Sequence, residues 1–147
     1  MAVFRYRMQN ILNIKEKIEE QEKQNFAIMR KKLTDEEEKL DALKKRLDEI
    51  TFDGKRIRED KINVIAIKEN TALREYYEGE IKSQLLRVRA AEKNLDNAAI
   101  KMQNAIKERK IQEKLKEHAY EEFLVEEGRR EAKEIDELTS YVYGQKE

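Results

Sequence analysis

The sequence contains no cysteine, no proline and no tryptophan, and its 147 residues include only four glycines and one histidine. Without cysteine the chain can form no disulfide, thiolate metal site or cysteine nucleophile, which fits a reducing cytosol. With one histidine, His118, no histidine triad, proton relay or histidine-based metal site can be assembled within one chain. Because proline is absent and glycine is scarce, few turns are expected, which favours long uninterrupted helices. The expected fold class is all-α.

Long hydrophobic runs are missing as well. The longest apolar run, residues 64–67, is far shorter than the roughly 18 residues that a bilayer-spanning helix needs. The opening "MAVFRYRMQN" has arginines but no apolar core behind them, so a secretory signal is not expected. Thirty-two basic residues balance thirty-two acidic ones, which gives no broad attraction to nucleic acid or to an anionic membrane. We therefore expect a cytoplasmic protein that binds no nucleic acid.

Motifs for catalysis are also absent. The glycines at positions 54, 79, 128 and 144 form neither of the two common phosphate-binding loop motifs. Glutamates and aspartates are plentiful, but next to lysines and arginines on helix faces they are typical of surface ion pairs. The sequence predicts no catalytic residue, no cofactor and no metal site, and the chain is not expected to be an enzyme.

What the chain does contain is charge, at 44% of its residues, and two amphipathic segments. In both segments, residues that are mostly apolar recur alternately three and four residues apart, which is the pattern of a coiled-coil seam. The first seam is Phe26, Met29, Leu33, Glu36, Leu40, Leu43, Leu47 and Ile50. The second is Ile81, Leu85, Val88, Glu92, Leu95, Ala99, Met102 and Ile106. We predict one long antiparallel helical hairpin over residues 1–147, with helix one at about 3–58, a connector at about 59–71 and helix two at about 72–142.

The register of the hairpin follows from the two seams, because the numbers of facing residues add up to a nearly constant value. A sum of about 131 pairs Ile50 with Ile81, makes most layers apolar on both sides and puts the turn near Ala66. It also sets Glu36 opposite Leu95, and Glu92 opposite Leu40. The two glutamates either extend outward from a thin seam or mark a weak point in the stalk.

The same register leaves the end of the second helix beyond the start of the first. About fifteen residues overhang, and they include the apolar residues Ile135, Leu138, Tyr141 and Val142. Such a stripe on a lone helix is typical of a surface that receives a partner helix or groove, although a frayed end would look the same. Tyr76 and Tyr77, near the connector, either dock a partner or cap the seam.

The whole chain resembles the FliJ family, small coiled-coil proteins of the bacterial flagellar type III export apparatus. The opening "FRYRMQNILNIKEKIEEQ" has an early aromatic residue followed by an apolar and charged helix. The stretches "ERKIQEKLKE" (108–117) and "RREAKEIDE" (129–137) resemble the C-terminal signature of that family. Their order and spacing over the full length carry the resemblance.

The resemblance implies a stalk similar to the central shaft of rotary ATPases, which couples its partners mechanically and leaves catalysis to them. Its expected partners are the hexameric flagellar export ATPase FliI, the export-gate protein FlhA and export chaperones. Through them it would lie at the cytoplasmic face of the inner membrane. The residues implied for binding the ATPase are Phe4, Met8, Ile11, Arg129, Arg130, Lys133, Asp136, Glu137 and Leu138. Those implied for the export gate are Leu43, Arg46, Ile50, Tyr77 and Ile81, of which Arg46 and Ile50 depart from the aromatic-rich pattern of enterobacterial relatives.

Three other functions remain open from the sequence. The chain could be the equivalent stalk of a virulence-type secretion system. It could also be a shaft subunit of a rotary ATPase, although such subunits usually carry an additional globular domain. A generic dimeric coiled-coil scaffold is the third possibility, and it predicts a stable dimer in solution.

Overall fold

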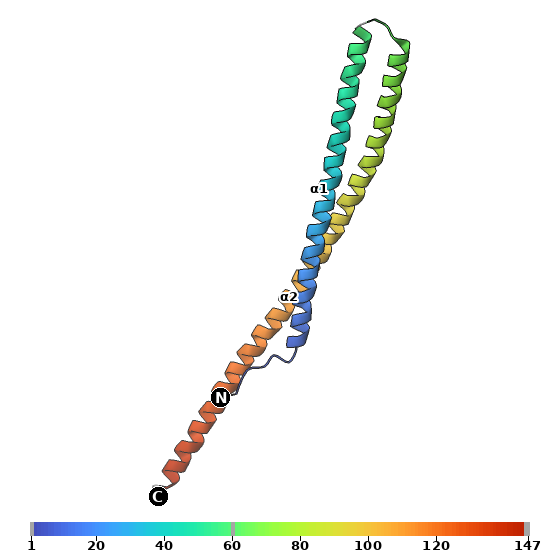
Figure 1. The fold of residues 1–147 in the computed structure, drawn as a ribbon. Coiled ribbons are helices and arrows are strands. Elements are labelled where there is room, and N and C mark those ends of the chain that lie inside the picture. The colour runs from blue at the N-terminus through green and yellow to red at the C-terminus, as the bar shows by residue number, and fades with distance from the viewer. Residues whose placement is uncertain (1, 60, 146–147) are drawn as a thin grey trace. The chain divides into compact units, whose positions relative to one another are not determined.

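The computed structural model describes residues 2–59 and 61–145, and in this part of the chain it has two long α-helices and no strand (Figure 1). Helix α1 spans Gln9–Glu59 and helix α2 spans Val64–Gln145. The two helices pack against each other, which confirms the prediction of an all-α hairpin of the coiled-coil type. The chain falls into two compact units: unit 1 is Met1–Gln21 with Gln103–Glu147, and unit 2 is Glu22–Met102.

Unit 2 contains the turn of the hairpin. Helix α1 ends at Glu59, and Asn63 caps the start of α2, because its Oδ1 accepts hydrogen bonds from the N–H groups of Ile65 and Ala66 at 3.2 and 3.3 Å. The link is therefore shorter than the expected connector at 59–71, and α2 begins before Ala66, where the turn was expected. Asp60, in the expected connector, lies outside the described residues.

The seam of α1 is the predicted one. All eight positions from Phe26 to Ile50 are buried or half-buried, and Leu40 and Ile50 are the most deeply covered. In α2, the predicted positions Ile81, Val88, Leu95 and Met102 are likewise buried or half-buried. At the other four predicted positions, Leu85, Glu92, Ala99 and Ile106, the preceding residue is more deeply buried than the predicted one. These more buried residues are Gln84, Ala91, Ala98 and Ala105. Polar and small residues therefore supply half of the α2 seam.

The predicted register is wrong. Asn70 lies against Gly54, which the predicted register pairs with residue 77, and its side chain donates a 2.9 Å hydrogen bond to the carbonyl of Ile50, which was expected opposite Ile81. Asn70 is therefore about two helical turns earlier in α2 than predicted. Glu36 was expected opposite Leu95, and it is bonded instead to Gln84. Glu92 does not face Leu40, because its side chain is exposed to solvent. The shift brings the two helices together around Gln84 and Asn70.

Unit 1 packs the start of α1 on the middle of α2. Leu12 is 3% exposed, and Lys15 forms a 2.9 Å ion pair with Glu108. Deeper in the seam, Glu19 pairs with Arg109 and is 6% exposed. The prediction placed the start of helix α1 at about residue 3. The helix begins at Gln9 instead, because the residues before it have an irregular backbone.

The last turns of α2 lie uncovered in unit 1. Each residue from 128 to 145 is exposed, although the backbone stays helical throughout. At about 1.5 Å per residue, this uncovered stretch is on the order of 25 Å long.

Candidate partner-binding surfaces

The first candidate surface is formed by the N-terminal residues and the α2 face beneath them. The ring of Phe4 lies 5.2 Å from that of Tyr120 and 5.4 Å from that of Phe123, measured between ring centroids. The hydroxyl of Tyr6 donates a 3.0 Å hydrogen bond to Gln112 Oε1, and Tyr6 is 9% exposed. Such edge-on and tilted aromatic contacts are favourable geometries. This part of the chain holds its place through side chains.

The structure divides the residues that were implied for ATPase binding into two groups. Phe4 and Met8 are half-buried against their own chain, and Ile11 is exposed on α1. The remaining members all lie in the uncovered stretch of α2: Arg129, Arg130, Lys133, Asp136, Glu137 and Leu138. Both groups belong to unit 1, so one compact unit contains the whole candidate set.

The uncovered stretch presents apolar side chains together with its charges. Ile135, Leu138, Tyr141 and Val142 are 62%, 64%, 64% and 50% exposed. Around them lie basic and acidic side chains, of which Arg130 pairs with Glu127 at 3.3 Å. Exposed apolar residues at helical spacing are typical of a helix that packs on another surface.

The candidate export-gate residues all lie in unit 2, but they differ in exposure. Ile50 is 2% exposed beneath Asn70, so its side chain is not part of the surface. Leu43, Tyr77 and Ile81 are half-buried along the seam. Arg46 is exposed, and hydrogen bonds to Glu49 and Tyr77 raise its pKa above the ordinary value. The ring of Tyr77 also meets that of Tyr76 edge-on at 5.3 Å.

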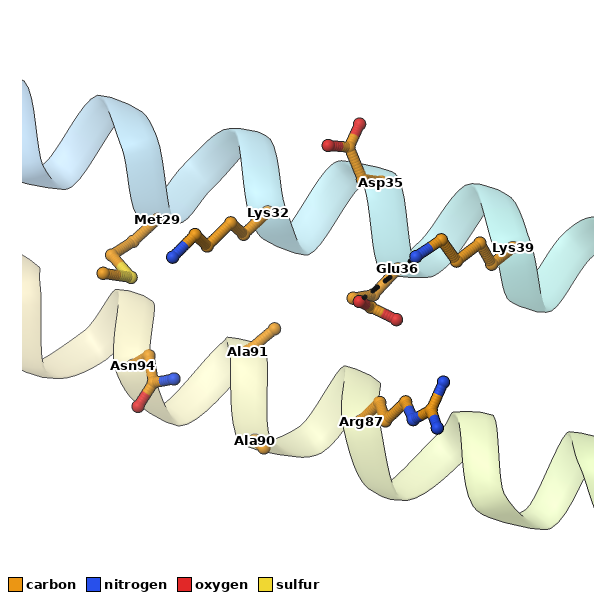
Figure 2. Close-up of a pocket in the computed structure, with 9 residues that line it drawn as sticks. All are labelled: Met29, Lys32, Asp35, Glu36, Lys39, Arg87, Ala90, Ala91 and Asn94. Carbon is orange, nitrogen blue, oxygen red and sulfur yellow. Dashed lines mark ion pairs between the residues drawn. The ribbon is translucent and has the colours of Figure 1, made fainter.

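A shallow cavity of about 390 Å³ lies between the helices of unit 2 (Figure 2). Ala90 and Ala91 form its α2 wall, where short side chains leave the space open. Glu36 extends towards α2 and pairs with Lys39 at 3.7 Å, as Figure 2 shows. The buried Gln84 donates hydrogen bonds to the carbonyl and the carboxylate of Glu36 at 2.9 and 2.5 Å. Glu36 is thus held in a polar layer of the seam.

Two polar contacts of the seam were not predicted from the sequence. Asn70, 8% exposed, lies so close to α1 that a Cβ atom at Gly54 would come within 3.1 Å of Asn70 Cγ. The second is the Glu19–Arg109 pair, and hydrogen bonds to Glu113 and Glu19 raise the pKa of Arg109 above its ordinary value. The sequence carries a signal for the first contact, since Gly54 and Asn70 interrupt the apolar pattern on either side of the turn.

Across 2–59 and 61–145, no three histidine, aspartate or glutamate side chains come close enough to hold a metal ion. In the same ranges, no helix has the length and hydropathy required to cross a bilayer.

Two long helices packed against each other, with no strand among the described residues, define a protein of the coiled-coil hairpin class. The family model described as flagellar FliJ protein matches residues 4–147, and the chain belongs to this family. Its membership makes it a protein associated with type III secretion.

A solved structure shares the fold. It is that of CT670 from Chlamydia trachomatis, described as a candidate YscO homolog, with 24% sequence identity and a TM-score of 0.78. The alignment covers 96% of this chain and 96% of that one. No curated protein matched the chain in sequence.

Proposed function

We propose that the protein is a non-enzymatic stalk of the flagellar type III export apparatus. In this role it binds the hexameric export ATPase FliI through unit 1, promotes assembly and activity of the ring, and contacts the export gate protein FlhA through unit 2. The observation that carries the proposal is the uncovered stretch of α2 in a chain that matches the FliJ family over residues 4–147. Export chaperones are further partners in this proposal.

The uncovered stretch supports ATPase binding because it offers two kinds of contact. Ile135 and Leu138 are more than half exposed and gain from leaving water. Arg129 and Lys133 are exposed beside them and can pair with acidic groups of the partner. A helix that ends in such a stretch fits into a pore or groove, where both contacts form at once.

Mechanical coupling is the proposed mechanism. Helix α2 alone has 82 residues and a contour length on the order of 120 Å. A packed helix pair resists bending, whereas a flexible linker would absorb displacement. The stalk would transmit the state of the ring to the gate, and it would lie at the cytoplasmic face of the inner membrane through its partners.

Binding to the cognate partners tests the proposal. The tagged full chain should retain the export ATPase and the cytoplasmic part of the gate protein from purified mixtures. A variant with Ile135→Asp and Leu138→Asp should lose the ATPase and keep the gate protein, because only unit 1 is changed. The proposal would be contradicted if the variant kept both partners, or if the unaltered chain retained neither.

A further inference from the structure

Residues 2–8, hereafter the strap, lie against α2 without forming a helix (Figure 1). Two aromatic side chains anchor the strap. Phe4 contacts the rings of Tyr120 and Phe123, and Tyr6 is hydrogen-bonded to Gln112. The same face of α2 packs on α1 further towards the seam, where Arg109 meets Glu19. The strap therefore covers the α2 face at the point where α1 no longer does.

Apart from these anchors, little holds the strap in place. Val3 is 80% exposed, and Arg5 and Arg7 are also exposed. The carbonyl of Tyr6 accepts a 3.1 Å hydrogen bond from the N–H of Gln9, and the carbonyl of the half-buried Met8 accepts hydrogen bonds from the N–H groups of Ile11 and Leu12 at 3.0 and 3.1 Å. These bonds tie only the last residues of the strap to the start of α1. Segments with few buried contacts and solvent-exposed backbone open at low free-energy cost. Opening would uncover the rings of Tyr120 and Phe123.

The strap also leaves space beside it. A cavity of about 610 Å³ lies between the strap and α2, and Leu115, Ala119 and Phe123 contribute to its α2 wall. A second cavity of about 370 Å³ adjoins Phe4, Gln9 and Lys116. The groove is wider than the chain that occupies it, so a segment with bulkier side chains could bury more surface there.

The charges of the strap and of the facing helix are opposite. The strap carries Arg5 and Arg7 and no acidic residue. The facing part of α2, residues 112–127, has two lysines, Lys114 and Lys116, against six glutamates: Glu113, Glu117, Glu121, Glu122, Glu126 and Glu127. Glu122 and Glu126 line the same cavity as Arg5 and Arg7. In a chain with no net charge, this local imbalance favours a basic occupant.

We propose that the strap is a displaceable occupant of a protein-binding groove on α2. The external ligand of the groove is an extended protein segment with two aromatic side chains flanked by arginine or lysine. Its aromatic rings take the place of Phe4 and Tyr6, and its basic groups face Glu122 and Glu126. The inference rests on the proposed function in placing a partner at unit 1, and it adds the chemistry of that partner and the competitor it displaces.

Competition within the chain has a measurable consequence. A ligand that binds only the open form has an apparent dissociation constant equal to the intrinsic one divided by the fraction of molecules in which the strap is open. Removal of the two anchors should therefore tighten binding of an external segment. If the strap were part of the binding surface, the same change would weaken it.

The test uses a synthetic peptide with the sequence of residues 2–9, AVFRYRMQ, as the probe. Its binding to the full-length chain and to the full-length variant Phe4→Ala/Tyr6→Ala is measured by NMR titration. We expect the variant to bind the peptide at least about fivefold more tightly than the unaltered chain does. The matched control Val3→Ala, an exposed position of the strap, should bind like the unaltered chain. A peptide with both arginines replaced by glutamate should bind neither protein.

A second variant keeps the test decisive if the anchor substitutions lower the helix content seen by circular dichroism. The full-length Glu122→Gln/Glu126→Gln chain keeps the anchors, and it should bind the peptide at least about threefold more weakly than the unaltered chain. Equal affinity in either comparison would overturn the proposal. No ATPase is present in the assay, so its failure would leave the proposed function standing, and loss of ATPase binding would leave the peptide result standing.

Discussion

The side-chain amide of Asn70 donates a hydrogen bond to the carbonyl of Ile50, and this contact joins α1 to α2 in unit 2. The close approach is possible because Gly54, one turn beyond Ile50, has no side chain. Asn70 and Gly54 are both buried in the seam, where a single polar residue can fix the register of a coiled coil. We infer that this pair sets the register of unit 2.

Gly54→Ala should destabilise the protein even though alanine is the better helix former. A methyl group at this position would overlap the side chain of Asn70, and overpacking of this kind costs about 1–3 kcal/mol, against a gain of up to about 1 kcal/mol in helix propensity. Thermal unfolding followed by circular dichroism measures the difference. The control is Gly79→Ala, which meets nothing within 4 Å and should raise stability slightly. An equal gain in both variants would show that the helices do not approach closely at Gly54.

Disulfide crosslinking should distinguish the observed register from the predicted one. The chain has no cysteine, so a pair introduced at Gly54 and Asn70 has no competitor. We expect rapid intrachain bridging of this pair under mild oxidation, because the Cβ atoms are close enough for a disulfide. A pair at Leu43 and Val88, which the predicted register places face to face, should bridge slowly, and gel mobility under non-reducing conditions reports both. Faster bridging of the second pair would restore the predicted register.

The sequence predicted one side of the seam far better than the other. In α1, each seam position apart from Glu36 carries a large apolar residue, and its neighbours are polar except for Ala27, Ile28 and Ala42, so the buried face is well marked. In α2, apolar or small residues stand side by side, as at Ala98 and Ala99, and the pattern does not show which of the two faces α1. Choosing the larger residue at each step led to Leu85 and Ile106, one residue past the buried positions.

This choice also explains the wrong register. Register was judged by counting layers with apolar residues on both sides, and that count penalises a layer containing Gln84 or Asn70. In the structure the amide N–H groups of these side chains donate to Glu36 and to the Ile50 carbonyl, which lowers the cost of burying them, although the buried Oδ1 of Asn70 has no partner among the described residues. Such bonds depend on the distance between the two backbones, which the order of residues in one helix does not contain.

Arg109→Met should destabilise the protein clearly more than the loss of an exposed ion pair does. The substitution would leave the carboxylate of Glu19, whose side chain is 8% exposed, without its guanidinium partner. Chemical denaturation with urea measures the loss. Arg130→Met is the matched control, because the side chain of Arg130 is 60% exposed where it pairs with Glu127, and its replacement should change stability by less than about 0.5 kcal/mol. Similar effects of both substitutions would contradict the burial of the Glu19–Arg109 pair.

Truncation after Glu127 should leave the hairpin folded. The removed residues are all exposed in the described range 128–145, so no packed layer of the seam is lost. We expect the melting temperature to stay within a few degrees, and the mean helicity per residue to stay nearly unchanged. A large fall in melting temperature would show that the uncovered stretch supports the fold.

The rate of ATP hydrolysis by the cognate export ATPase, measured with and without this protein, tests the central claim most directly. The full-length chain should raise the rate, and the chain truncated after Glu127 should raise it much less. This drop in stimulation should exceed what the loss of exposed ion pairs could cause, since each such pair is worth about 1 kcal/mol or less. Arg46 is a candidate export-gate residue in unit 2, so the variant Arg46→Ala should stimulate ATP hydrolysis as much as the full-length chain does. A rate that the full-length chain leaves unchanged, or that the truncated chain raises equally, would contradict a stalk that acts through the end of α2.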